Sequence, residues 1–369
     1  MTASAVTLFL CGDVMLGRGV DQILPRPGDP ALREAYVRDA RAYVELAEAV
    51  NGPVPRPVGP GWPWGDALAV LDAWAPDVRV VNLETSVTGD GTFAAGKDVH
   101  YRMHPGNLPA LAVARPHACV LANNHVLDFG RRGLEDTLDA LAGAGLRTVG
   151  AGHDADEAWR PAVVPLGGRR VVVTAFGMAS SGIPPGWAAT GDRPGVAFVP
   201  EATPEAADSV VRRVRRVARP GDVVVASVHW GSNWGYATGR DQVRFAHALV
   251  DGGVHVVHGH SSHHPRPLEL YRDGLVLYGC GDLIDDYEGI TGYERYRDDL
   301  RPLYLVAVDP GSGRPPDVRI VPMRARRMRL EHAPDEDLAW LRATLDRISG
   351  GFGAHVELDP RGALVVSSR

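Results

Sequence analysis

The sequence predicts an α/β sandwich, and three observations support this prediction. Short valine-rich apolar runs recur along the 369 residues, and most are continuous rather than alternating, as expected for strands covered on both faces. Segments with helical spacing of apolar residues lie between several of these runs, which is the element order of an α/β fold. The composition is ordinary for a globular chain, with 45% hydrophobic and 23% charged residues.

The elements can be placed in chain order. Leu134, Leu138 and Leu141 share one helical face before Gly143 ends the helix. The expected helices are Asp66–Trp74, Leu134–Leu141, Thr203–Ala218, Gln242–Val250 and Asp335–Ile348. The expected strands are Val6–Cys11, Val78–Val81, Ala118–Leu121, Val171–Phe176, Val223–Val228, Val254–Val257, Leu275–Tyr278 and Leu303–Val308.

One domain is expected over residues 1–330, with a helical extension, 331–369, packed on it. Residues 22–65 are rich in proline and glycine at both ends, which indicates an insertion. Its middle, Ala31–Val50, has a helical pattern. The sequence leaves open whether this insertion is a lid or a dimer contact.

Charge and cysteine usage narrow the class of protein. The net charge of −6 gives no reason to expect nucleic acid or an anionic membrane as a partner. The three cysteines form no CxxC pair, so we expect reduced, buried thiols. The N-terminal apolar run is shorter than the roughly 20 residues that span a bilayer, and no basic segment precedes it. A cytoplasmic protein is therefore expected.

Polar side chains follow the predicted strands at the positions where a site would form. In open α/β sheets, sites are built from the loops at the carboxyl ends of strands. Residues far apart in the chain can therefore converge. The residues that follow strands in this way are Asp13, Asn82, Glu84, Asn123, Asn124, His125, His229, His258, His260, His263, His264, Asp282, Asp285 and Asp286.

This set combines carboxylates, amides and imidazoles without cysteine, which favours Ca, Mn, Mg or Zn over a soft metal. Asn124 offers a neutral oxygen, and His125 beside it can act as an acid or base, with Asp128 fixing its tautomer. Each piece alone has an ordinary structural explanation. A strand followed by Gly-Asp is commonly a turn, and His258 can cap a strand. Asp285 and Asp286 can be a solvated pair, and two of the four histidines in HGHSSHH are expected to be structural.

At these residues the sequence resembles a known family. The segments GDVMLGR (12–18), NLE (82–84), ANNHVLDFG (122–130), VHWGSNW (228–234) and GHSSHH (259–264) are similar to those of CapA-type, poly-γ-glutamate capsule synthesis proteins of the calcineurin-like metallophosphoesterase superfamily. The resemblance implies a calcineurin-like four-layer α/β/β/α sandwich with a metal site at the strand ends. It implies metal ligation by Asp13, Glu84, Asn124, His229, His260 and His263, with His125 as an acid/base.

The sequence departs from that pattern at two places. Superfamily members typically begin Asp-x-His, whereas Met15 stands at the third position here, so a single divalent ion is expected rather than a pair. The family's Gly-Asn-Phe after the last core strand is replaced by GCGDLIDDY, which adds Asp282. These departures, and the absence of an anchor, resemble the family branch that epimerises lasso-peptide precursors.

Three functions follow as hypotheses. The first is a metal-dependent peptide epimerase that inverts a C-terminal Cα by two-base proton transfer, with Asp13/His260 and His125/Asp282 as its acid/base pairs. Arg102 and Trp234 would bind the peptide substrate. The second is a metal-dependent hydrolase, or an enzyme that works with a ligase, on a γ-glutamyl amide or phosphoester. The third is a binding module without turnover. The metal's identity and the oligomeric state stay open.

Overall fold

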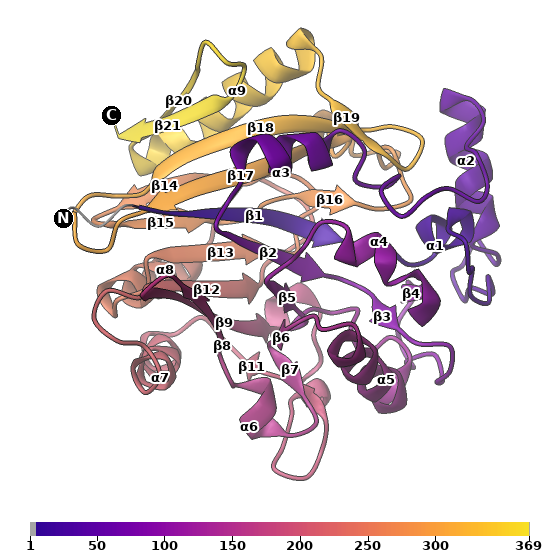
Figure 1. The fold of residues 1–369 in the computed structure, drawn as a ribbon, viewed down its shortest axis with the longest axis horizontal. Coiled ribbons are helices and arrows are strands. Elements are labelled where there is room, and N and C mark those ends of the chain that lie inside the picture. The colour runs from indigo at the N-terminus through magenta and orange to yellow at the C-terminus, as the bar shows by residue number, and fades with distance from the viewer. Residues whose placement is uncertain (1–4, 369) are drawn as a thin grey trace.

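The fold is built on two β-sheets, and the computed structural model describes residues 5–368 of the chain. The larger, 10-stranded sheet has the order β20-β21-β18-β17-β1-β2-β5-β6, with β16 beside β1 and β19 beside β18 (Figure 1). Its strands are β1 (Val6–Val14), β2 (Val78–Leu83), β5 (Ala118–Val120), β6 (Thr148–Val149), β16 (Asp282–Ile284), β17 (Leu300–Val308), β18 (Asp317–Ala325), β19 (Leu330–His332), β20 (Ala354–Leu358) and β21 (Leu364–Ser368).

The second sheet has 7 strands in the order β11-β9-β12-β13-β15-β14, with β8 beside β9. They are β8 (Ala162–Leu166), β9 (Arg169–Met178), β11 (Phe198–Val199), β12 (Val223–His229), β13 (Val256–His260), β14 (Leu268–Tyr271) and β15 (Gly274–Leu277). Two small sheets pair β3 (Ser86–Val87) with β4 (Arg102–Met103), and β7 (Ala151–Gly152) with β10 (Gly195–Val196).

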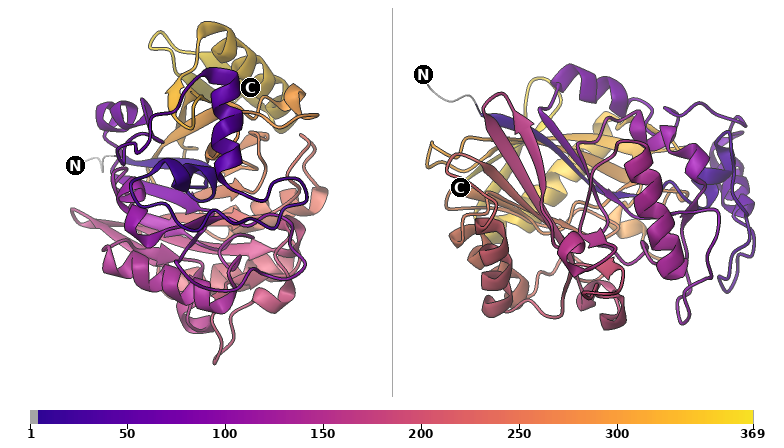
Figure 2. Two further views of the ribbon diagram at one scale, coloured as in Figure 1. Left: turned by 90° about the vertical axis from the view of Figure 1, so that its right-hand side faces the viewer. Right: turned by 60° about the horizontal axis from the view of Figure 1, so that its bottom comes forward.

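Helices cover the outer face of each sheet, as the two views of Figure 2 show. The helices α1 (Gly19–Ile23), α3 (Ala67–Trp74), α4 (Pro109–Ala112) and α5 (Gly130–Gly143) lie on the larger sheet. The helices α6 (Ala155–Ala158), α7 (Pro204–Arg215) and α8 (Arg240–Asp251) lie on the second sheet. Helix α2 (Arg41–Asn51) belongs to the insertion, and α9 (Asp335–Ser349) packs at one edge of the sheets. The predicted four-layer α/β/β/α sandwich is confirmed.

The layering follows from the side-chain alternation of buried strands. On β1, Leu8 and Leu10 face the core between the sheets, whereas Phe9 and Cys11 face the helices. Both faces are apolar because both are covered. This is why the strand sequences read as continuous apolar runs. The three cysteines, Cys11, Cys119 and Cys280, are free and buried.

Parallel strands bring their carboxyl ends to one edge of the molecule. Strands β1, β2 and β5 are parallel to one another, and so are β9, β12, β13 and β15. Figure 1 shows β1, β2, β12 and β13 ending on the side where α1 and α2 lie. The polar residues that follow these strands are therefore placed under the insertion.

Two sequence-based expectations need correction. Residues 31–40 of the insertion are not helical, and only the second half of the expected helix forms, as α2. Residues 31–40 do not form a helix because Glu34 forms an ion pair with Arg18, and Ala31 forms a β-bridge with Asp39. The extension 331–369 is not purely helical either: after α9 it adds β20 and β21 to the larger sheet, where Leu364 and Val366 bury their side chains.

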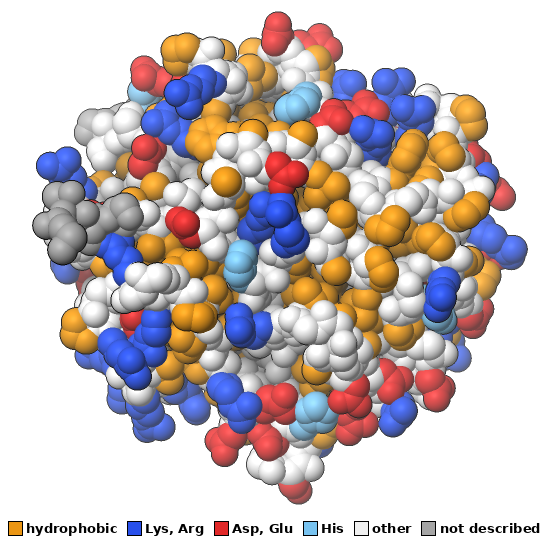
Figure 3. All heavy atoms as spheres, in the orientation of Figure 1, with side chains coloured by type: hydrophobic (Ala, Val, Ile, Leu, Met, Phe, Trp, Pro, Cys, Tyr) orange, Lys and Arg blue, Asp and Glu red, His pale blue; other side chains and the backbone are white. Residues whose placement is uncertain are grey.

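The surface shows mixed charge. On the face drawn in Figure 3, Lys and Arg side chains are interspersed with Asp and Glu, and hydrophobic side chains appear on the right-hand part, over the region of α1 and α2. Within residues 5–368, no helix has the length and apolar character needed to cross a membrane.

Candidate metal centre and cavity

The strand ends bring the expected metal ligands together. Asp13 lies opposite both Asn82 and Asp282 in the parallel pairs of β1 with β2 and β16. His229 and His260 are likewise opposite each other at the ends of β12 and β13. The close approach of β1 to the chain before β16 requires Gly12, because a Cβ there would lie 1.5 Å from the Gly281 carbonyl oxygen.

One group in the described part of the chain has the spacing of a metal site. Asp13, His229 and His260 are buried, and each offers a ligand atom within 4.8 Å of the others. His229 Nδ1 lies 2.7 Å from His260 Nδ1. His229 Nε2 lies 3.0 Å from Asn124 Oδ1 and 3.8 Å from Glu84 Oε1. The group thus combines carboxylate, amide and imidazole donors, which suits a hard or borderline divalent cation.

The carboxylates of this group share a single hydrogen-bond donor. Asn82 Nδ2 donates to Asp13 Oδ1 at 2.7 Å and to Glu84 Oε2 at 2.9 Å, so two buried carboxyl groups share one amide. Asp13 Oδ2 is buried and finds no hydrogen-bond partner within residues 5–368. Burial and the nearby Asp282 raise the pKa of Asp13 to about 7. Burial also raises the pKa of Glu84 well above its ordinary value.

The histidines show the complementary effect. Burial lowers the pKa of His229 and of His260 well below the ordinary value, so both are held as neutral imidazoles. Neutral imidazole is the form that ligates a metal. An orphaned carboxylate oxygen among neutral imidazoles and an amide oxygen therefore fits a divalent cation.

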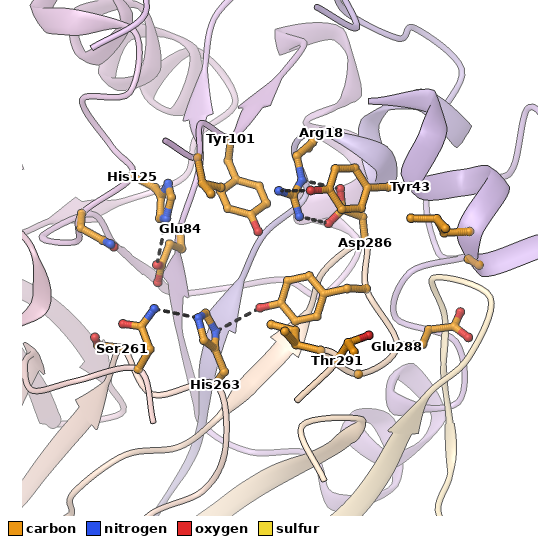
Figure 4. A pocket seen from close by; sticks show the side chains of 18 of the residues that line it. Arg18, Tyr43, Glu84, Tyr101, His125, Ser261, His263, Asp286, Glu288 and Thr291 are labelled. Atoms are coloured by element: carbon orange, nitrogen blue, oxygen red, sulfur yellow. Dashed lines mark hydrogen bonds and ion pairs between the residues drawn. The ribbon is translucent and has the colours of Figure 1, made fainter. Parts of the chain in front are cut away.

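His125 lies beside this group with its two ring nitrogens in different surroundings. Its Nδ1 is 2.7 Å from Asp128 Oδ2, and its Nε2 is 3.8 Å from Glu84 Oε1 on the cavity side (Figure 4). The backbone N–H of Tyr101 donates to the same Asp128 oxygen at 2.7 Å. Burial lowers the pKa of His125 to about 4. Asp128 thus orients a neutral imidazole whose Nε2 faces the cavity.

Lys97 contacts the His125–Asp128 pair, and the sequence analysis did not identify it. Its ammonium contacts Asp128 Oδ1, the Asn124 carbonyl oxygen and, at 2.9 Å, His125 Nδ1. It is the only lysine in a chain whose other basic residues are arginines. Being the single lysine is the one feature of the sequence that could have indicated a role for Lys97.

Asp282 and His263 belong to a second, separately neutralised cluster. His263 Nδ1 lies 3.0 Å from Asp282 Oδ2, and the Tyr287 hydroxyl donates to the same oxygen. The fully buried Arg301 lies 3.2 Å from Asp282 and 2.7 Å from Asp285. Burial alone would raise the pKa of Asp282, but His263 and Arg301 hold it at about 2. These carboxylates already have a cation.

Arg301 is expected to matter mainly for stability. Replacing it by methionine would leave Asp282 and Asp285 buried without their cation. Removing one partner of a buried pair costs about 3–5 kcal/mol. Urea unfolding of Arg301→Met should show a loss of this size. The exposed ion pair between Arg244 and Asp241 supplies the control, since Arg244→Met should cost less than about 1 kcal/mol. Equal losses for the two variants would contradict this account.

The remaining strand-end residues make local contacts. His258 Nε2 lies 2.7 Å from the Cys11 carbonyl oxygen, and its Nδ1 lies 3.0 Å from Ser227 Oγ. His264 is fully buried, and its Nε2 accepts from the Gly235 N–H at 3.1 Å. Asp286 pairs with Arg18. These contacts bind strands and loops together.

The centre opens into a cavity of about 600 Å³. Figure 4 shows Glu84, His125, Ser261 and His263 at one end and Arg18, Tyr43 and Asp286 at the other. The lining residues are Arg18, Tyr43, Leu46, Ala47, Val50, Glu84, Val99, Tyr101, Asn124, His125, Asn233, Ser261, His263, Asp286, Tyr287, Glu288, Gly289, Ile290 and Thr291.

The two residues expected to bind substrate are not among the lining residues. The Arg102 guanidinium pairs with Asp29 at 3.1 Å and lies over the Phe129 ring. Trp234 stacks on Tyr293 with ring centroids 4.0 Å apart. Both side chains are engaged by neighbouring loops, and their predicted role in binding stays a prediction.

The fold and the site together define an α/β protein with a carboxylate–imidazole centre at the strand ends. The family model described as "Bacterial capsule synthesis protein PGA_cap" matches residues 7–287. The chain therefore belongs to the PGA_cap family of bacterial capsule synthesis proteins.

Curated relatives bear related names. The chain is 56% identical over 363 residues to a protein of Mycobacterium tuberculosis named "Probable polyglutamine synthesis accessory protein", covering 98% of this chain and 96% of that protein. It is 26% identical to the "PGA biosynthesis protein CapA" of Bacillus subtilis, covering 82% of this chain and 68% of that protein. It is 25% identical to the "Capsule biosynthesis protein CapA" of Bacillus anthracis, over 79% of this chain and 62% of that protein.

Solved structures are more distant. A 5′-nucleotidase precursor from Thermus thermophilus matches with a TM-score of 0.45 at 18% identity, covering 84% of this chain and 52% of that one. The NAD nucleotidase NadN of Haemophilus influenzae matches with a TM-score of 0.46 at 10% identity, covering 90% of this chain and 59% of that one.

The prediction of a peptide epimerase is wrong. The relatives that match most of the chain are named for polyglutamine synthesis and capsule biosynthesis, not for epimerisation of peptides. The structure also fails to form one of the two expected acid/base pairs. Asp282 pairs with His263 and Arg301, and His125 pairs with Asp128 instead. The altered motifs therefore do not indicate the lasso-peptide branch.

Proposed function

We propose that the protein is a single-ion, metal-dependent hydrolase of γ-glutamyl amide bonds that works in poly-glutamate synthesis. The observation that carries the proposal is the buried Asp13 Oδ2, which has no hydrogen-bond partner within residues 5–368 and belongs to one group with His229 and His260. Glu84 and Asn124, which line the cavity, both contact His229. The relatives are named for polyglutamine synthesis and PGA biosynthesis, and the resemblance to poly-γ-glutamate capsule synthesis proteins supports a glutamate polymer as the product.

The proposed ligands are Asp13, Glu84, Asn124, His229 and His260. When bound, a divalent cation there would polarise a carbonyl and lower the pKa of a bound water. His263 is among the ligands that the resemblance implies, but its Nδ1 is engaged by Asp282 and Tyr287. Arg301 already neutralises that side of the site, which favours one ion over two. Ca, Mn, Mg and Zn all suit the donor set.

His125 is the proposed acid/base group. Asp128 and Lys97 occupy the Nδ1 side of its ring, so the Nε2 side is available to a substrate in the cavity. The unprotonated Nε2 can take a proton from the attacking water and then pass it to the departing amine nitrogen. Such positioned proton transfer contributes typically about 10²–10⁴-fold to the rate.

The cavity favours an amide over a phosphate dianion. Arg18, the one guanidinium among the lining residues, is paired with Asp286 and Glu34. Lys97 is held by Asp128. Apart from an ion at the metal centre, neither Arg18 nor Lys97 is free to pair with a doubly charged phosphate. A neutral amide needs no such cation.

The test is hydrolysis of γ-glutamyl-para-nitroanilide by chelator-stripped protein with and without added manganese. Metal-dependent release of para-nitroaniline is expected. Faster turnover of para-nitrophenyl phosphate would overturn the amide assignment in favour of a phosphoesterase. Metal binding without turnover of either compound would point to the binding module and overturn the proposal.

A further inference from the structure

The cavity has a polar end beside the metal centre and an opposite end that carries an apolar wall. Glu84, Asn124 and His125 lie at the polar end, beside the metal centre. The other lining residues include aliphatic side chains from two segments outside both sheets. These are Leu46, Ala47 and Val50 of α2, and Ile290 of the loop after β16. The centre's own strands contribute none of this apolar wall.

Helix α2 presents that wall although it leaves apolar surface exposed to solvent. Val44 and Ala47 are buried. Leu46 is 58% exposed and Val50 is 78% exposed, and their spacing of one helical turn puts both on the same face. Exposed apolar side chains gathered at the mouth of a cavity are typical of a binding surface.

The charged residues at this end disfavour an anion. Arg18 donates twice to Asp286 and once to Glu34, and its guanidinium lies 3.8 Å from the Tyr43 ring centroid and 4.5 Å from that of Tyr101. Glu288, another lining residue, accepts from the Met328 N–H. A carboxylate at this end would lose water and meet carboxylates without an unpaired cation among the lining residues.

We propose that the cavity selects γ-glutamyl amides whose amine carries an apolar group, and that this group lies against Leu46, Val50 and Ile290. The inference rests on the proposed function, because the amide must lie at the polar end. It implies action where a glutamate is joined to an apolar amine. Bonds between two glutamates are poor substrates, since the second glutamate would place its carboxylate against the apolar wall.

Binding and cleavage are measured separately with manganese-loaded protein. Calorimetry compares γ-glutamyl-butylamide, γ-glutamyl-methylamide and γ-glutamylglutamate, and mass spectrometry follows their hydrolysis. The butylamide is expected to bind at least tenfold more tightly than γ-glutamylglutamate, because its butyl group is buried against the apolar wall. Each buried methylene contributes about 0.8 kcal/mol, which is roughly fourfold in affinity.

The variant Leu46→Asp should reduce the affinity ratio of butylamide to methylamide at least threefold. Leu358→Asp is the matched control, since Leu358 is a leucine of similar exposure, 49%, on β20 and is not a lining residue. Equal affinity for the three amides, or an unchanged ratio in Leu46→Asp, would overturn this inference. Selective binding of the butylamide without hydrolysis would overturn the proposed function and leave the specificity intact.

Discussion

Asp13→Asn is expected to make the metal-free protein more stable while abolishing its stabilisation by metal. The folded-state pKa of Asp13 is raised from 3.8 to about 7. The folded state therefore holds the proton more tightly, and the ionised carboxylate lowers stability progressively as the pH rises between those values. At pH 8 the asparagine removes this cost, so a gain of up to about 4 kcal/mol is expected, because each unit of raised pKa corresponds to about 1.4 kcal/mol. Below pH 4 the gain should vanish.

The same substitution removes a ligand. Wild-type protein in metal at a thousandfold excess over its Kd should gain about 4 kcal/mol in free energy of unfolding. Asp13→Asn should lose most of that increment. Urea unfolding at pH 8, with chelator and then with manganese, measures both effects on one protein.

Asp282→Asn is the matched control, because it changes another buried aspartate on the neighbouring strand. Asp282 is compensated by His263 and Arg301, and its pKa is held at about 2. Its replacement should destabilise the metal-free protein and leave most of the metal increment in place. If Asp13→Asn destabilises the metal-free form and keeps the metal increment, Asp13 is not a ligand of the bound ion.

His125→Gln is expected to reduce kcat for γ-glutamyl-para-nitroanilide by about 10²–10⁴-fold. Glutamine fills similar space but cannot transfer the proton. The metal increment in unfolding free energy should persist, because His125 is not among the proposed ligands. Stopped assays at saturating manganese give kcat, and the unfolding measurement on the same preparation gives metal binding.

The control is His153→Gln, at a histidine whose side chain is 45% exposed and pairs with Glu157 away from the cavity. Its kcat should match that of the wild type. Equal losses in both variants, or loss of metal binding in His125→Gln, would assign His125 a structural role.

Much of the fold and of the centre follows from the sequence, because burial leaves a direct pattern. Strands covered on both faces appear as apolar runs, as Val223–His229 and Val6–Val14 do. A polar residue that follows such a run lies at a strand end, and this rule places Asp13, His229 and His260 among the fourteen candidate site residues. Parallel pairing then places them opposite one another.

The sequence did not reveal which side chains contact one another in the folded protein. Nothing local distinguishes Arg301, which neutralises Asp282, from the many surface arginines. The apolar wall of α2 was likewise hidden, because Leu46 and Val50 follow an ordinary amphipathic pattern. Because Asp282 pairs with Arg301, it does not form the predicted acid/base pair with His125. The epimerase hypothesis therefore loses its geometric basis.

The most direct test of the central claim is anomalous diffraction from manganese-soaked crystals of the wild-type protein. The account predicts one peak per chain, bounded by Asp13, His229 and His260, and none at Asp282 and His263. The peak should be absent from Asp13→Asn crystals soaked in the same way. Two peaks would contradict the single-ion site, and no peak in the wild type would contradict the metal centre itself.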